Sequence, residues 1–115
     1  MVNVVCPTRY KINRRLIKST INEFLLKLGI PAHFQLNIVF VGRNKMKTVA
    51  EKYKDEKIAL PVLSFAYDQD KDNLFGEIFI CYPQAVLLAA ERNKKVDDII
   101  TSLIKHGINN IISKL

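Results

Sequence analysis

The 115-residue sequence contains no apolar run that approaches the roughly 20 residues needed to span a membrane. It has only two cysteines, Cys6 and Cys81, each within a segment that is typical of a strand. We therefore expect buried free thiols rather than a disulfide framework. At the N-terminus apolar residues precede basic ones, which is the reverse of a secretory signal. These absences predict a cytoplasmic protein without a membrane segment.

The sequence also lacks repeats, low-complexity segments and linkers, so we expect a single domain over residues 1–115. The net charge is +7, from 18 Lys and Arg against 11 Asp and Glu. Residues 1–57 hold twelve basic side chains against four acidic ones, whereas residues 58–115 hold six against seven. A basic first half indicates a polyanionic partner, with nucleic acid first, although a solvated lysine-rich helix gives the same composition.

Apolar periodicity predicts four strands and four helices in the order βαβαββαα. The strands are expected at Val2 to Cys6, Phe34 to Val41, Ile58 to Ala66 and Leu74 to Tyr82. The helices are expected at about Ile12 to Leu28, residues 43–57, Gln84 to Arg92 and Val96 to Leu115. A short polar turn predicts that the last two strands are antiparallel, and Pro61 indicates an edge or a bulge for the third.

The last twenty residues form the helix around which we expect the chain to be organised. Paired apolar residues occur on every turn, a stripe wider than a surface helix needs. The sequence therefore predicts an α/β (α+β) fold, with a mixed four-stranded sheet packed with helices around a central C-terminal helix. His106 and Asn110 share one edge of the apolar stripe because they are four residues apart. We expect any chemistry to lie at that edge.

The sequence resembles the YbeY family of rRNA maturation endoribonucleases in five ordered segments: LNIVFV (Leu36 to Val41), the helix that ends in EKYK (Glu51 to Lys54), VLSFAYD (Val62 to Asp68), LFGEIFICYPQA (Leu74 to Ala85) and IKHGINN (Ile104 to Asn110). The resemblance implies a small α/β fold with a central helix that bears H-G-x-L-H, followed shortly by G-Y-D-H. Its three histidines would hold a zinc ion that activates water against RNA.

The motif of the family is only partly present. His106 and Gly107 match, but Asn110 stands where the second histidine is expected, and the third would fall one residue beyond Leu115. Because a neutral amide is a poor zinc ligand, the resemblance implies a degraded site and no cofactor. His106 and Asn110 would be its remnant, with His106 as a metal ligand only if zinc is bound. Lys54 replaces an arginine that is usual in the family, which loses bidentate phosphate recognition.

Other polar residues have simpler interpretations. Three interpretations of His106 stay open: a surviving metal ligand, a general base, or a buried histidine that is hydrogen-bonded to a neighbour. The last is the commonest case, and we favour it. Glu77 matches an acidic position of the family, but a single carboxylate in a strand more often pairs than catalyses. Asp68, Asp70 and Asp72 alternate in a turn that lacks the glycine and closing glutamate of a calcium loop.

The candidates for RNA binding are basic residues of the first two helices: Arg14, Arg15, Lys18, Lys45, Lys47, Lys54 and Lys57. If both groups border a cleft at His106, they would hold an RNA backbone with little sequence preference. Most aromatic residues fall at core-like positions in strands, so no aromatic stacking surface is expected.

The sequence thus predicts a YbeY-like factor of rRNA maturation and ribosome assembly that binds ribosomal RNA and has a degraded zinc endoribonuclease site. Two alternatives stay open. One is an active zinc-dependent endoribonuclease whose site is completed unconventionally, for example by a second chain. The other is a non-catalytic scaffold that binds ribosomal proteins or an assembly GTPase. The sequence leaves the oligomeric state open.

Overall fold

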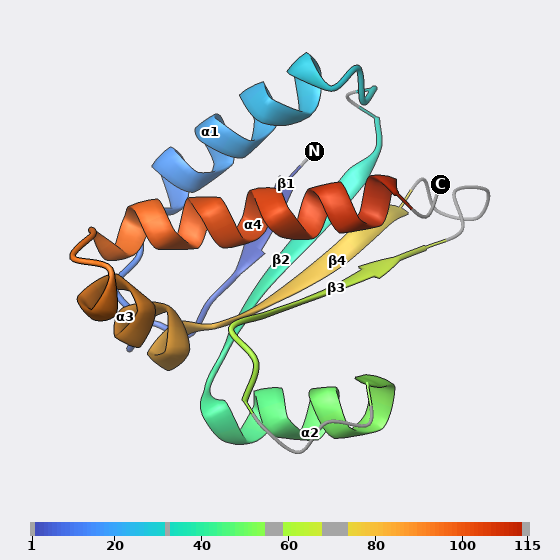
Figure 1. Cartoon of the computed structure of the whole chain (residues 1–115). Coiled ribbons are helices and arrows are strands. Elements are labelled where there is room, and N and C mark those ends of the chain that lie inside the picture. Colours follow the sequence, from blue (N-terminus) through green and yellow to red (C-terminus); the bar gives the residue numbers. More distant parts are fainter. Residues whose placement is uncertain (1, 32, 55–58, 68–73, 114–115) are drawn as a thin grey trace.

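The computed structural model describes residues 2–31, 33–54, 59–67 and 74–113 and contains a four-stranded sheet (Figure 1). The strands are β1 (Val2–Val5), β2 (Gln35–Val41), β3 (Val62–Ala66) and β4 (Leu74–Cys81), in the spatial order β1-β2-β4-β3. β1, β2 and β4 are parallel, and β3 pairs antiparallel with β4. The mixed sheet, the antiparallel last pair and the edge position indicated by Pro61 are therefore confirmed.

Four helices cover the two faces of the sheet unequally. They are α1 (Arg14–Lys27), α2 (Arg43–Lys54), α3 (Tyr82–Glu91) and α4 (Val96–Ile112), which completes the predicted order. α1, α3 and α4 share one hydrophobic core with Ile78 and Ile80 of β4. α2 packs on the other face, in a separate cluster with Leu63 of β3. Figure 1 shows α2 on the side of the sheet opposite α1 and α4.

α4 is the central helix that the sequence predicted. Its buried residues are Ile99, Ile100, Ile104, Gly107, Ile108 and Ile111. The helix contacts β3, β4, α1 and α3, so it is covered on several sides. A Cβ atom at Gly107 would lie 2.9 Å from Cδ1 of Ile78, and the glycine thus lets the helix lie close to the sheet. Within the described residues no helix is long and apolar enough to cross a membrane.

Polar groups decide where some elements begin. α1 starts after Asn13 rather than at Ile12, because the Asn13 side chain accepts an N-cap hydrogen bond from the Leu16 amide at 3.0 Å. β3 starts at Val62, directly after Pro61, which has no N–H group for the strand ladder. The predicted ends at residues 58 and 115 lie outside the described residues.

Arg14 has a structural role at the outer edge of the sheet. Its guanidinium donates hydrogen bonds to the carbonyl oxygens of Val4, at 2.8 Å, and Cys6, at 2.7 Å. β1, which ends at Val5, is an edge strand, and among the described residues no further strand pairs with it on that side. A charged group on such an edge also opposes pairing with another chain. The guanidinium of this RNA-binding candidate is therefore already engaged by the backbone.

We expect Arg14→Gln to lower the free energy of unfolding by about 1–2 kcal/mol, because two charge-assisted hydrogen bonds are lost. Urea denaturation measures the change. The matched control is Arg15→Gln on the exposed surface of α1, which should change the free energy of unfolding by less than about 0.5 kcal/mol. Equal effects of the two substitutions would contradict the structural role.

Candidate nucleic-acid interface

His106 and Asn110 lie one turn apart on α4, and both are exposed. Ile104, two residues before His106, and Ile108, two residues before Asn110, are fully buried. Two residues of helix turn by about 200°, which places His106 on the side of α4 away from the buried stripe. The favoured interpretation of His106 as a buried histidine is therefore wrong.

The residues at this edge of α4 do not fit a zinc ion. A single imidazole, at His106, is accompanied by the neutral amide of Asn110. Zinc in proteins takes at least three thiolate, imidazole or carboxylate ligands. In the described part of the chain no group of three or more His, Cys, Asp or Glu is placed to hold a metal ion. No reaction step through zinc follows from this arrangement.

The basic candidates divide between two helices on opposite faces of the sheet. α1, with its three candidates, packs on the face that α4 covers, and α2, with Lys45 and Lys47, packs on the other (Figure 1). The two groups therefore do not border one cleft at His106. Lys57 and the side chain of Lys54 lie outside the described residues.

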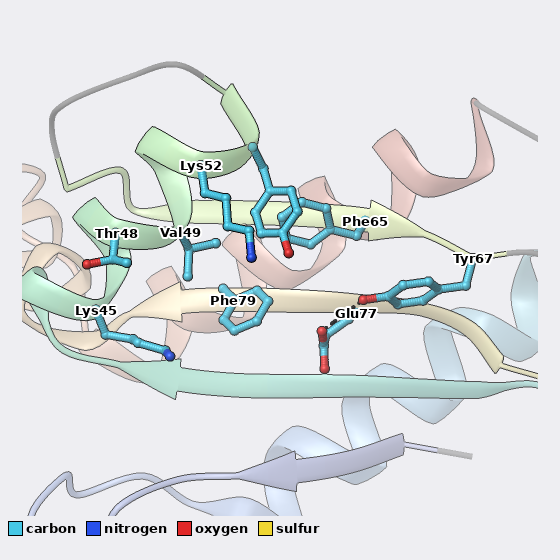
Figure 2. Close-up of a pocket in the computed structure, with 9 residues that line it drawn as sticks. Lys45, Thr48, Val49, Lys52, Phe65, Tyr67, Glu77 and Phe79 are labelled. Atoms are coloured by element: carbon cyan, nitrogen blue, oxygen red, sulfur yellow. Dashed lines mark hydrogen bonds between the residues drawn. The ribbon is translucent and has the colours of Figure 1, made fainter.

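A pocket of about 390 Å³, here called the α2 pocket, lies between α2 and the strands β3 and β4 (Figure 2). Its α2 wall carries Lys45, Lys52 and Tyr53, all exposed. Its sheet wall carries Phe65 and Phe79, both half-buried. Successive side chains of a strand point to opposite faces, so the odd-numbered residues of β3 and β4 meet α2 while the even-numbered residues of β4 meet α4.

Three aromatic rings form a continuous lining in the α2 pocket. The ring centroids of Tyr53 and Phe65 are 5.1 Å apart, and those of Phe65 and Phe79 are 5.8 Å apart, both in edge-to-face geometry. Tyr53 is 57% exposed, and Lys52 Nζ lies 5.3 Å from its ring centroid. The sequence placed Phe65 and Phe79 at core-like positions, but α2 covers these strand residues only in part, so their rings also line this pocket. The sequence did contain a signal for this pocket: aromatic residues at alternate positions of two strands, close in the chain to a lysine-rich helix.

Tyr67 and Glu77 belong to the same pocket. The Tyr67 hydroxyl donates a hydrogen bond to Glu77 Oε1 at 2.9 Å (Figure 2). Burial, followed by this hydrogen bond and the charge of Glu77, raises the pKa of Tyr67 to about 12. Glu77 therefore pairs with a neighbour, as its simpler interpretation predicts, and that neighbour keeps its proton at neutral pH.

We expect Tyr67 to ionise at about pH 12 rather than near its ordinary pKa of 10.0. Since the unfolded chain releases this proton at lower pH than the folded chain does, the stabilising contribution is complete below about pH 10 and is lost as the pH rises toward 12. Tyrosinate absorbance measures the titration, with Tyr67→Phe to assign the signal. Glu77→Gln should lower the pKa of Tyr67, and an unchanged pKa in that variant would argue against the interaction.

The arrangement of sheet and helices is that of a known α+β fold. A solution structure of a Thermotoga maritima protein matches this chain with a TM-score of 0.69. The match covers 94% of this chain and 69% of that one, at 19% sequence identity. At this identity the likeness establishes the fold alone.

The chain belongs to the YbeY family, because the sequence model of that family, described as Endoribonuclease YbeY, matches residues 7–111. One relative with this description, from Finegoldia magna, is 27% identical over 84% of this chain and 65% of its own length. Another, from a Janthinobacterium strain, is 31% identical over 72% of this chain and 56% of its own length. The chain thus spans less than two thirds of these relatives. The resemblance drawn from the ordered sequence segments is confirmed.

Proposed function

We propose that this chain is an RNA-binding factor of rRNA maturation and ribosome assembly in the cytoplasm, and that ribosomal RNA docks in the α2 pocket. The observation that carries the proposal is the combination of two lysines with the contacting rings of Tyr53, Phe65 and Phe79 in one pocket. Membership of the YbeY family supports RNA as the ligand. Basic groups that follow the backbone and rings that stack on bases are the two kinds of contact that hold a flexible RNA strand.

Lys45 and Lys52 supply the contacts to phosphates. They lie seven residues apart, which is about 10 Å along the helix axis. Both side chains are exposed, and within the described residues neither forms an ion pair. Their ammonium groups therefore attract phosphates with little dependence on base sequence.

Tyr53, Phe65 and Phe79 supply the stacking surface. Each base stacked on an aromatic side chain contributes about 1–3 kcal/mol to single-strand binding. The faces of bases are accessible in single strands and covered in a duplex. The α2 pocket should therefore bind single-stranded RNA more tightly than duplex RNA.

The proposal assigns no hydrolysis to the α4 edge, because His106 and Asn110 do not make a zinc site by themselves. An active zinc endoribonuclease would need further ligands, for example from a second chain. Elemental analysis of the purified protein distinguishes the two alternatives. Stoichiometric zinc in the purified protein would favour the active endoribonuclease. Absence of zinc would favour RNA binding without zinc chemistry.

Fluorescence anisotropy with single-stranded rRNA fragments tests the proposal, with duplexes of the same sequence as the control. If two phosphates are neutralised, the affinity should fall roughly sevenfold between about 50 mM and 200 mM salt. No binding at the lower salt concentration would overturn the proposal. A protein partner retained after ribonuclease treatment, without RNA binding, would favour the scaffold instead.

A further inference from the structure

The α2 pocket contains an acidic residue that phosphate binding does not need. Glu77 lines the pocket together with Lys45 and Lys52, yet within the described residues it forms no ion pair with a lysine or an arginine. A negative charge among basic groups weakens the attraction for an RNA backbone. Glu77 is therefore better suited to N–H donors than to phosphates.

We propose that Glu77 gives the α2 pocket a preference for guanine, by accepting hydrogen bonds from the N1–H and N2–H groups of a base stacked on the Phe79 ring, beside Phe65. This inference rests on the proposed RNA-binding function. It adds the identity of the base and the residue that recognises it.

The strand register places Glu77 beside the stacking surface. Glu77 of β4 is directly opposite Phe65 of β3, and side chains of such a pair lie about 5 Å apart at Cβ on the same face. Phe79 is two residues further along β4 and also lines the pocket. Figure 2 shows Glu77 next to Phe79, with Lys45 on the other side of that ring. A base stacked on Phe79 would thus have one edge toward the carboxylate and its backbone toward the lysines.

The chemistry of the carboxylate favours guanine over the other bases. An ionised carboxylate has about four acceptor sites on two oxygens, and the Tyr67 hydroxyl occupies one of them. Guanine offers two adjacent N–H donors on one edge, which both oxygens can accept. Adenine and cytosine offer a single amino group. Uracil offers one N–H group, but this group lies between two carbonyl oxygens, and the carboxylate repels both of these oxygens.

Tyr67 acts as a positioning residue in this proposal. Its hydrogen bond to Oε1 holds the Glu77 side chain at one orientation without neutralising its charge. The Tyr67 hydroxyl keeps its proton at neutral pH, because even the ordinary tyrosine pKa of 10.0 lies well above that range, so it can donate there. Tyr67→Phe should therefore reduce the preference for guanine in part, whereas loss of the carboxylate should abolish it.

Binding of four single-stranded oligouridines, identical except for a central G, A, C or U, tests the inference by fluorescence anisotropy. We expect the guanine oligonucleotide to bind about tenfold more tightly than the uridine one, with adenine and cytosine between them. Glu77→Gln, which keeps the shape of the side chain and an oxygen for Tyr67, should bind all four with similar affinity. Its affinity for the uridine oligonucleotide should be unchanged or slightly higher.

Lys52→Gln is the control, because it should weaken all four complexes by the same factor. Equal affinities in the wild type would overturn the guanine preference and leave RNA binding intact. A preference that survives Glu77→Gln would show that another group reads the base. If no oligonucleotide binds, the proposed function fails, and this inference fails with it.

Discussion

Replacement of Gly76 by alanine is expected to lower the free energy of unfolding by about 3 kcal/mol, the upper end of the usual range for overpacking. A Cβ atom at this position would lie 2.7 Å from the carbonyl oxygen of Phe65 and 2.7 Å from Cδ1 of Ile111. The Phe65 oxygen belongs to the backbone of β3, which is paired with β4 and cannot shift alone. Relief of the contact with Phe65 therefore requires a distorted strand pair, whatever the Ile111 side chain does.

Gly107→Ala is the matched control for this prediction. The three atoms nearest its new Cβ would all belong to the Ile78 side chain, at 2.9 Å and 3.2 Å, and none of them is a backbone atom. Alanine also favours a helix over glycine by about 1 kcal/mol, which offsets part of the crowding. We expect a net loss below about 1 kcal/mol in urea denaturation. Similar losses for the two variants would contradict the contrast between backbone and side-chain contacts.

The double variant Lys45→Gln/Lys52→Gln is expected to bind single-stranded RNA about 25-fold more weakly at about 0.1 M salt, if each lysine neutralises one phosphate. The slope of log affinity against log salt should become shallower by roughly 1.4, because each such contact contributes about 0.7 for single strands. Both side chains are exposed on α2, so the fold should be unaffected. Anisotropy titrations at several salt concentrations measure the affinity and the slope together.

The control removes the same amount of charge from the opposite face. Arg15→Gln/Lys18→Gln lies on α1, whose core contacts are shared with α4 rather than with α2. This variant should bind RNA within about twofold of the wild type, because surface charges beyond a Debye length of about 10 Å are largely screened. An equal loss for both double variants would mean that net charge, and not the α2 pocket, attracts the RNA.

The separation of the two faces also bears on catalysis. An RNA strand in the α2 pocket is on one side of the sheet, and His106 belongs to a helix on the other side. Such a strand would reach His106 only by passing round an edge of the sheet. Binding in the pocket and chemistry at the α4 edge are therefore separable, and the two sets of experiments above address them independently.

Local patterns in the sequence determined most of the fold. The order of the elements, the edge position of β3 and the antiparallel β3 and β4 pair follow from apolar periodicity, from Pro61 and from the short turn. The central position of α4 follows from an apolar stripe too wide for a surface helix. The family followed from segments that are specific only as an ordered set.

Only the tertiary structure decided how the candidate site residues are grouped. α2 leads from β2 into β3, which runs antiparallel, so the handedness rule for parallel crossovers does not fix the face on which α2 lies. That face separates the lysines of α2 from His106 and joins them to Phe65, Phe79 and Glu77. Periodicity indicates which side of a strand or helix a residue occupies. It does not indicate which other element covers that side. The packing of α2 on β3 and β4 is what forms the pocket.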